Sequence, residues 1–63
     1  MSKTPCYHVT TMAGEVYGVA ATAIRDAMQL TQDRLFGEGS TDKPMAAKRV
    51  AMWEADYGTV LHY

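Results

Sequence analysis

The pattern of apolar and polar positions is most regular between Thr22 and Phe36. With successive residues rotated by about 100°, as in an α-helix, the apolar side chains gather on one arc and the charged ones on the other. The first arc carries Ile24, Ala27, Met28, Thr31 and Leu35, and the second carries Arg25, Asp26, Gln29, Gln32 and Asp33. This period predicts an amphipathic helix over residues 22–36. An isolated helix of this length is marginally stable in water, so its apolar stripe needs a packing partner.

The ends of this helix carry the expected capping residues. The Thr22 hydroxyl is suited to accept a hydrogen bond from an N–H of the first turn, which predicts Thr22 as the N-cap. Gly37 and Gly39 follow the last periodic residue and can adopt the left-handed conformation that ends many helices. A loop over residues 37–44 is predicted next.

The stretch before the helix alternates with a period of two and predicts a β-hairpin over residues 6–20, preceded by a flexible start at 1–5. In the first strand, Tyr7, Val9 and Thr11 share one face, while Cys6, His8 and Thr10 share the other. Gly14 is placed for a positive φ in the turn. Gly18 interrupts the return strand, which indicates a bulge or a close approach of the helix backbone.

The C-terminal stretch supports two interpretations. As β structure, residues 48–63 form a second hairpin, in which Arg49 to Ala55 pairs with Thr59 to Tyr63. As helix, residues 44–57 place Ala46, Val50, Trp53 and Tyr57 on one face, with Asp42 as a cap and Gly58 as the end. The hairpin is favoured because the β-prone run at 59–63 needs a neighbouring strand, and a hairpin supplies one at the lowest cost.

The predicted fold is therefore a single α+β domain over residues 1–63, with the order ββαββ. A four-stranded antiparallel sheet carries one helix on one face, and ββααβ is the alternative. The side chains expected beneath the helix are Val9, Val19, Val50, Met52 and Val60. A chain of 63 residues buries only about 60% of its extended surface, so a homodimer is a reasonable expectation.

Charge and composition argue against several classes of function. The formal net charge is -1, and the six basic residues are scattered rather than clustered, which disfavours nucleic acid and anionic membranes as partners. The start of the chain lacks the apolar core of a signal peptide. The single cysteine, Cys6, fits a reducing compartment, so a cytoplasmic location is expected.

Candidates for catalysis and metal binding are weak. Cys6 and His8 share a strand face, but no electropositive surroundings are evident to activate the thiol, and the favoured interpretation is a buried cysteine beside a half-exposed histidine. Cys6, His8 and His62 lack the spacing of known zinc motifs. We therefore expect no enzyme activity, no cofactor and no metal.

The abundance of aromatic and methionine side chains exceeds what one helix can cover, which favours binding to another protein. The predicted partner-binding residues are Trp53, Tyr57, Tyr7 and Tyr17. The alternative is a small nucleic-acid-associated regulator that uses Lys48 and Arg49. In size, and in lacking a catalytic motif, the chain is similar to small accessory proteins of bacteriophages and mobile elements, several of which inhibit a host enzyme or defence complex by binding it.

Overall fold

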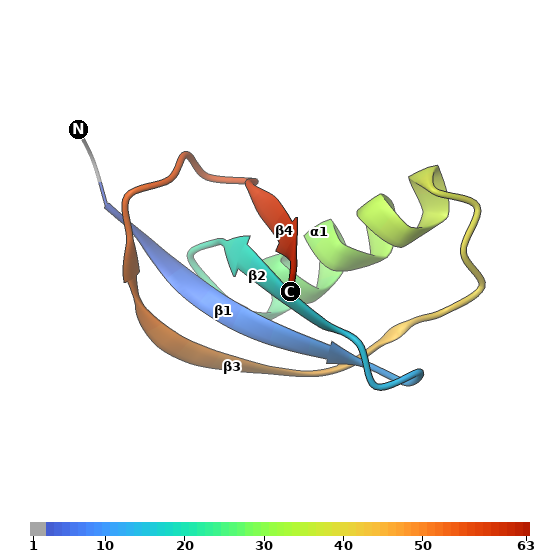
Figure 1. Cartoon of the computed structure of the whole chain (residues 1–63). Helices are drawn as coiled ribbons and strands as arrows, with labels where there is room; N and C mark the ends of the chain where they lie inside the picture. The colour runs from blue at the N-terminus through green and yellow to red at the C-terminus, as the bar shows by residue number, and fades with distance from the viewer. Residues whose placement is uncertain (1–2) are drawn as a thin grey trace.

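The computed structural model describes residues 3–63 and contains one four-stranded sheet with a single helix lying across one face (Figure 1). In chain order the elements are β1 (Thr4–Thr11), β2 (Val16–Ala20), α1 (Ile24–Gly37), β3 (Pro44–Trp53) and β4 (Val60–His62). This order confirms the predicted ββαββ arrangement and its α+β class. The prediction of a flexible start over residues 1–5 is wrong for residues 4 and 5, because they belong to β1. Residues 1 and 2 lie outside the described part of the chain.

The strands lie in the order β3-β1-β2-β4, and each neighbouring pair is antiparallel. The prediction of a hairpin over residues 48–63 is therefore wrong, because β3 and β4 occupy opposite edges of the sheet. β3 pairs with β1 from Thr4 to Thr11, whereas β4 is only three residues long and pairs with β2. A hairpin with such a short partner would have left most of β3 without backbone hydrogen bonds. Alternating side chains predict a strand, but they do not specify its neighbour.

The alternative helix over residues 44–57 is not formed, since Pro44–Trp53 is β3. As a helix, this segment would have left the outer edge of β1 without hydrogen-bond partners. The connection after β3 instead crosses to the far edge of the sheet. There, the Gly58 N–H donates to the Ala20 carbonyl at 2.8 Å, and the Ala20 N–H donates to the Thr59 carbonyl at 2.9 Å.

The core lies between α1 and the sheet face that carries Tyr7, Val9 and Thr11. It consists of Tyr7, Val9, Tyr17, Val19, Ala21, Ala27 and Leu35. The predicted burial of Val9 and Val19 is confirmed, and Val60 packs against this cluster. Val50 and Met52 instead remain exposed. Between Cys6 and Tyr7 the register with β3 shifts, so that Val50 is passed over as a bulge.

The helix begins two residues later than predicted, at Ile24, with Ala23 as its N-cap. Thr22 does not cap it; the Thr22 hydroxyl donates to Asp26 at 3.4 Å instead. At the other end, the Gly39 N–H donates to the Phe36 carbonyl and the Ser40 N–H to the Leu35 carbonyl. This hydrogen-bond pattern is a Schellman motif, and Gly39 occupies its left-handed position with φ of 74°.

Gly18 makes room for a side chain of the C-terminus rather than for the helix. A Cβ atom at Gly18 would lie 2.5 Å from the Tyr63 hydroxyl oxygen. The Tyr63 ring in turn meets the His8 ring edge to face, with centroids 5.0 Å apart. Tyr63 therefore lies across the sheet face opposite α1, and a larger residue at position 18 would displace it.

We expect Gly39→Ala to lower the free energy of unfolding by about 1 kcal/mol, because alanine is strained at a positive φ. Gly37→Ala is the matched control, since Gly37 has no positive φ and a Cβ there meets open space. That substitution should be neutral or stabilise the helix by up to about 1 kcal/mol. Urea denaturation of both variants measures the difference, and equal shifts would contradict the role given to Gly39.

Candidate functional site

A hollow is lined by residues of the β1–β2 turn, of the C-terminal end of α1 and of the loop that leads to β3. In Figure 1 these three segments lie toward the same end of the molecule. The hollow is an open cleft of about 800 Å³. Its lining comes from all three segments and from β2: Met12, Ala13, Glu15, Tyr17, Leu35, Glu38, Ser40, Thr41, Asp42 and Lys43. The cleft thus exists only when segments distant in sequence are brought together.

Asp42 holds the two loops of this end together. Its Oδ1 accepts hydrogen bonds from the Ala13 N–H at 3.1 Å and from the Lys43 N–H at 2.9 Å. The Met12 N–H donates to the Lys43 carbonyl at 2.9 Å and adds a backbone link. The nearby hydroxyl of Thr11 is the main cause that lowers the pKa of Asp42, and the N–H groups of Lys43 and Ala13 lower it further. The ionised carboxylate therefore fixes one side of the cleft.

Tyr17 lies at the base of the cleft with only 4% of its surface exposed. Its ring stacks on His62, with centroids 4.5 Å apart. No hydrogen bond joins the Tyr17 hydroxyl to another group of residues 3–63, and no fully buried side-chain polar atom in that range lacks a partner. The hydroxyl must therefore reach the solvent of the cleft that the residue lines.

Negative charge surrounds this hydroxyl. Burial is the main cause that raises the pKa of Tyr17, and the carboxylates of Glu38, Glu15 and Asp42 raise it further, while Arg34 lowers it. A phenolate would be unfavourable in this setting. Tyr17 thus presents a neutral O–H group, able to donate or accept a hydrogen bond, beneath three carboxylates.

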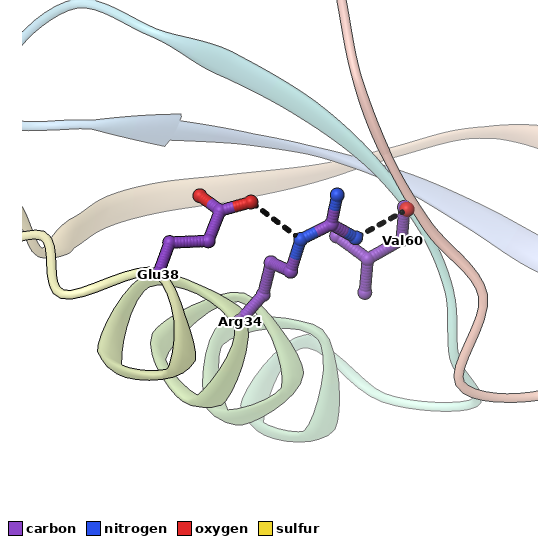
Figure 2. Close-up of polar contacts among 3 residues, drawn as sticks. All are labelled: Arg34, Glu38 and Val60. Carbon is purple, nitrogen blue, oxygen red and sulfur yellow. Dashed lines mark hydrogen bonds and ion pairs between the residues drawn. The ribbon is translucent and has the colours of Figure 1, made fainter.

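Arg34 joins α1 to Val60 of β4, as Figure 2 shows. Its Nε lies 2.7 Å from Oε2 of Glu38, and its Nη1 donates to the Val60 carbonyl at 3.1 Å. Glu15 on the opposite side lies 3.6 Å from Nε2 of His62. Both contacts are about half exposed, so each contributes little to stability. Their carboxylates remain open to further contacts from solvent.

Large apolar side chains are exposed around this end. Phe36 is 84% exposed, Met12 71% and Met45 60%. Phe36 also lines a smaller hollow of about 270 Å³, which shares residues 40–43 with the main cleft. We call Met12, Phe36, Met45 and the main cleft the loop-end surface.

The structure separates the four residues predicted to bind a partner. Tyr7 and Tyr17 belong to the buried core, and of the four only Tyr17 lines the cleft. Trp53 is half-buried at the end of β3. Tyr57 is exposed, and its hydroxyl donates to Asp26 near the start of α1 at 3.0 Å, which raises the pKa of Tyr57. Their contact with a partner stays a prediction.

Lys48 and Arg49, the predicted alternative contacts for nucleic acid, lie exposed on β3 at the edge of the sheet. No carboxylate forms an ion pair with either residue within residues 3–63.

Phe36 and Met12 were not predicted as site residues. The sequence did contain a signal for Phe36, because it follows Leu35 directly on the helix and so falls outside the apolar arc.

Cys6 and His8 do not converge with His62. His62 pairs with Tyr17, which lies in the core beneath α1, whereas His8 contacts Tyr63 on the opposite face of the sheet. Over residues 3–63, no three or more histidine, cysteine, aspartate or glutamate side chains are grouped so that they could hold a metal ion. Within the same range, no helix has the length and apolar character needed to cross a membrane.

No family model matches the chain, and comparison with curated proteins and with solved structures finds no match either.

We expect Asp42→Asn to destabilise the protein at neutral pH, and the difference from the parent to shrink as the pH becomes strongly acidic. The folded-state pKa of Asp42 lies below its ordinary value of 3.8. The ionised group therefore stabilises the fold above that value, and this stabilisation is lost as the pH falls through the folded-state pKa. Urea denaturation across this pH range measures the effect.

Asp33→Asn is the matched control for Asp42→Asn, because it removes an exposed carboxylate of α1 that hydrogen-bonds only to Gln29 among residues 3–63. It should leave the pH dependence of the free energy of unfolding as in the parent. An unchanged pH dependence in the Asp42→Asn variant would refute the role of Asp42 as the link between the loops.

Proposed function

We propose that this protein is a small non-enzymatic protein-binding module that acts by occupying a surface of another protein through the loop-end surface. The observation that supports this is the exposure of three large apolar side chains at one end of the molecule: Met12 lines the main cleft, Phe36 lines the hollow that shares residues 40–43 with it, and Met45 lies just after these residues at the start of β3. Exposed apolar side chains that gather in one region of a small domain are typical of a site of interaction. Aromatic and methionine side chains are suited to it, because the former anchor interfaces and the latter adapt to irregular surfaces.

The proposed mode of action is obstruction, which needs only an exposed apolar surface that can be buried against a partner. A bound copy inhibits its partner by covering a surface that the partner needs. For an accessory protein of the phage or mobile-element type, this partner is a host enzyme or a component of a defence complex. A second copy of the chain is the competing occupant of the same surface, and sedimentation of the purified protein distinguishes self-association from a foreign partner.

Phe36 is expected to be the principal anchor of the interface. Burying a phenylalanine side chain contributes about 1.5–3 kcal/mol relative to leaving it exposed. We therefore expect Phe36→Ala to weaken partner binding by about tenfold or more, since 1.4 kcal/mol corresponds to a factor of ten. The free energy of unfolding should change by less than about 0.5 kcal/mol, because the side chain makes little contribution to the core.

The measurement is quantitative pull-down from a nuclease-treated native lysate, read by mass spectrometry, with Ile24→Ala as the matched control. Ile24 is an exposed apolar residue too, at 51%, but it lies at the opposite end of α1. One protein captured by the parent and the control, and lost with Phe36→Ala, supports the proposal. Equal capture by all three proteins would assign binding to another surface.

A nucleic-acid-associated role is the second candidate, because Lys48 and Arg49 are exposed on an edge strand without carboxylate partners among residues 3–63. This second candidate requires that partner capture is seen only when nucleic acid is left in the lysate. Binding should also fall steeply with added salt and be lost when Lys48 and Arg49 are substituted. Capture that survives nuclease treatment removes this candidate.

The sequence-based choice of Trp53 as an anchor makes a competing prediction, because Trp53 lies at the end of β3 away from the loop-end surface: in that case Trp53→Ala weakens partner binding while the fold persists. Trp53 is only half-buried, so the loss of stability should be smaller than the ~3–5 kcal/mol typical of a fully buried tryptophan. The amide resonances in the NMR spectrum of Trp53→Ala should stay dispersed, as in a folded protein. Leu61→Ala, at an exposed apolar position of β4, serves as the control. Loss of this dispersion would mean that the variant is unfolded, so that the Trp53 side chain is needed for the core and is not assigned to the interface.

A further inference from the structure

We infer that the cleft of the loop-end surface binds the guanidinium group of an arginine side chain that the partner presents. This inference rests on the proposed function and specifies the chemistry of its partner. Two independent observations carry it: the charge of the cleft lining, and the hydroxyl group of the buried Tyr17 side chain, which reaches the cleft and hydrogen-bonds to no group of residues 3–63.

The lining of the cleft carries three carboxylates, Glu15, Glu38 and Asp42, against a single ammonium group, Lys43. The carboxylates come from different segments and face a shared space. Arg34 engages only Oε2 of Glu38, and Glu15 is half exposed with His62 as its neighbour. Oxygen atoms of at least two carboxylates are therefore open to a cationic group that enters the cleft.

The Tyr17 hydroxyl is the second observation. The side chain is almost completely buried, yet its hydroxyl makes no hydrogen bond within residues 3–63 and reaches the cleft. The Tyr17 ring is fixed by stacking on His62 and by its place in the core. The hydroxyl is therefore pre-positioned, and a donor entering the cleft satisfies it without any rearrangement of the side chain.

The geometry favours guanidinium over ammonium. A guanidinium group has five N–H donors in a planar fork and can reach acceptors on several sides at once, whereas an ammonium group acts as a compact point charge. The acceptors here are distributed between the β1–β2 turn, β2, the end of α1 and the following loop. Met12, Ala13 and Leu35 supply apolar walls for the methylene groups of the arginine.

The test is an NMR titration of the full chain with N-acetyl-arginine amide, which serves as a probe independent of the natural partner. We expect saturable shifts of the amide resonances of Ala13, Glu38 and Lys43, which surround the cleft. N-acetyl-citrulline amide is nearly isosteric but neutral and should cause no saturable shift. Added salt should weaken binding of the arginine probe, because the carboxylates are partly exposed.

Two pairs of variants identify the groups involved. Tyr17→Phe removes only the hydroxyl and should weaken arginine binding by about fivefold, while Tyr7→Phe alters a buried tyrosine outside the cleft and should not. Glu15→Gln should weaken binding by about threefold, and Glu54→Gln, an exposed carboxylate after β3, should not. The two tyrosine variants keep their rings in the core, so the fold is expected to persist.

Equal shifts with the arginine and citrulline probes, or shifts that Tyr17→Phe leaves unchanged, would overturn the inference. Tighter binding of N-acetyl-lysine amide would overturn the assignment to guanidinium. The titration needs no partner, so its failure is distinct from failure of the proposed function. A partner captured equally by the parent and Tyr17→Phe would preserve the binding module and reject the arginine site.

Discussion

The pairing of β1 with two strands at once is the constraint on which the rest of the structure depends. β1 is central in the sheet, and its residues pair with β2 on one side and with β3 on the other. Because β2 and β3 are separated by β1, the chain between them must cross the sheet, and α1 makes that crossing. The burial of Val9 and Val19 beneath the helix follows from this arrangement.

The same crossing creates the cleft. After α1 ends at the Schellman motif around Gly39, the chain returns to the edge of the sheet beside the β1–β2 turn. Asp42 joins these two loops through hydrogen bonds from Ala13 and Lys43, and Arg34 joins α1 to β4. The hollow between them contains carboxylates and one buried tyrosine, while Phe36 projects into solvent beside it. The proposed binding properties are therefore consequences of how the loops are closed.

The residues differ in how far their roles could be predicted. Val9, Val19, Ala27 and Leu35 are buried as their periodicity indicated, because a face of a strand or helix is a local property. For Gly18 a bulge or a close approach of the helix backbone was predicted; the residue lies in regular pairing, and it is the Tyr63 side chain, just after β4, that approaches it. Tyr17 combines two roles that its sequence position could not separate: its ring is core and its hydroxyl faces the cleft.

The sequence by itself determined the class of fold, the amphipathic helix and the left-handed conformation of Gly14 and Gly39, because each depends on side-chain periodicity or on the conformational range of one residue. The same expectation for Gly37 was wrong, since Gly37 is the last residue of α1 and has no positive φ. Only the tertiary structure decided that β3 and β4 lie at opposite edges, that Val50 forms a bulge, and that Glu15, Glu38 and Asp42 surround Tyr17. Strand neighbours are chosen by competition between backbone partners distant in the chain, and local alternation carries no information about that competition.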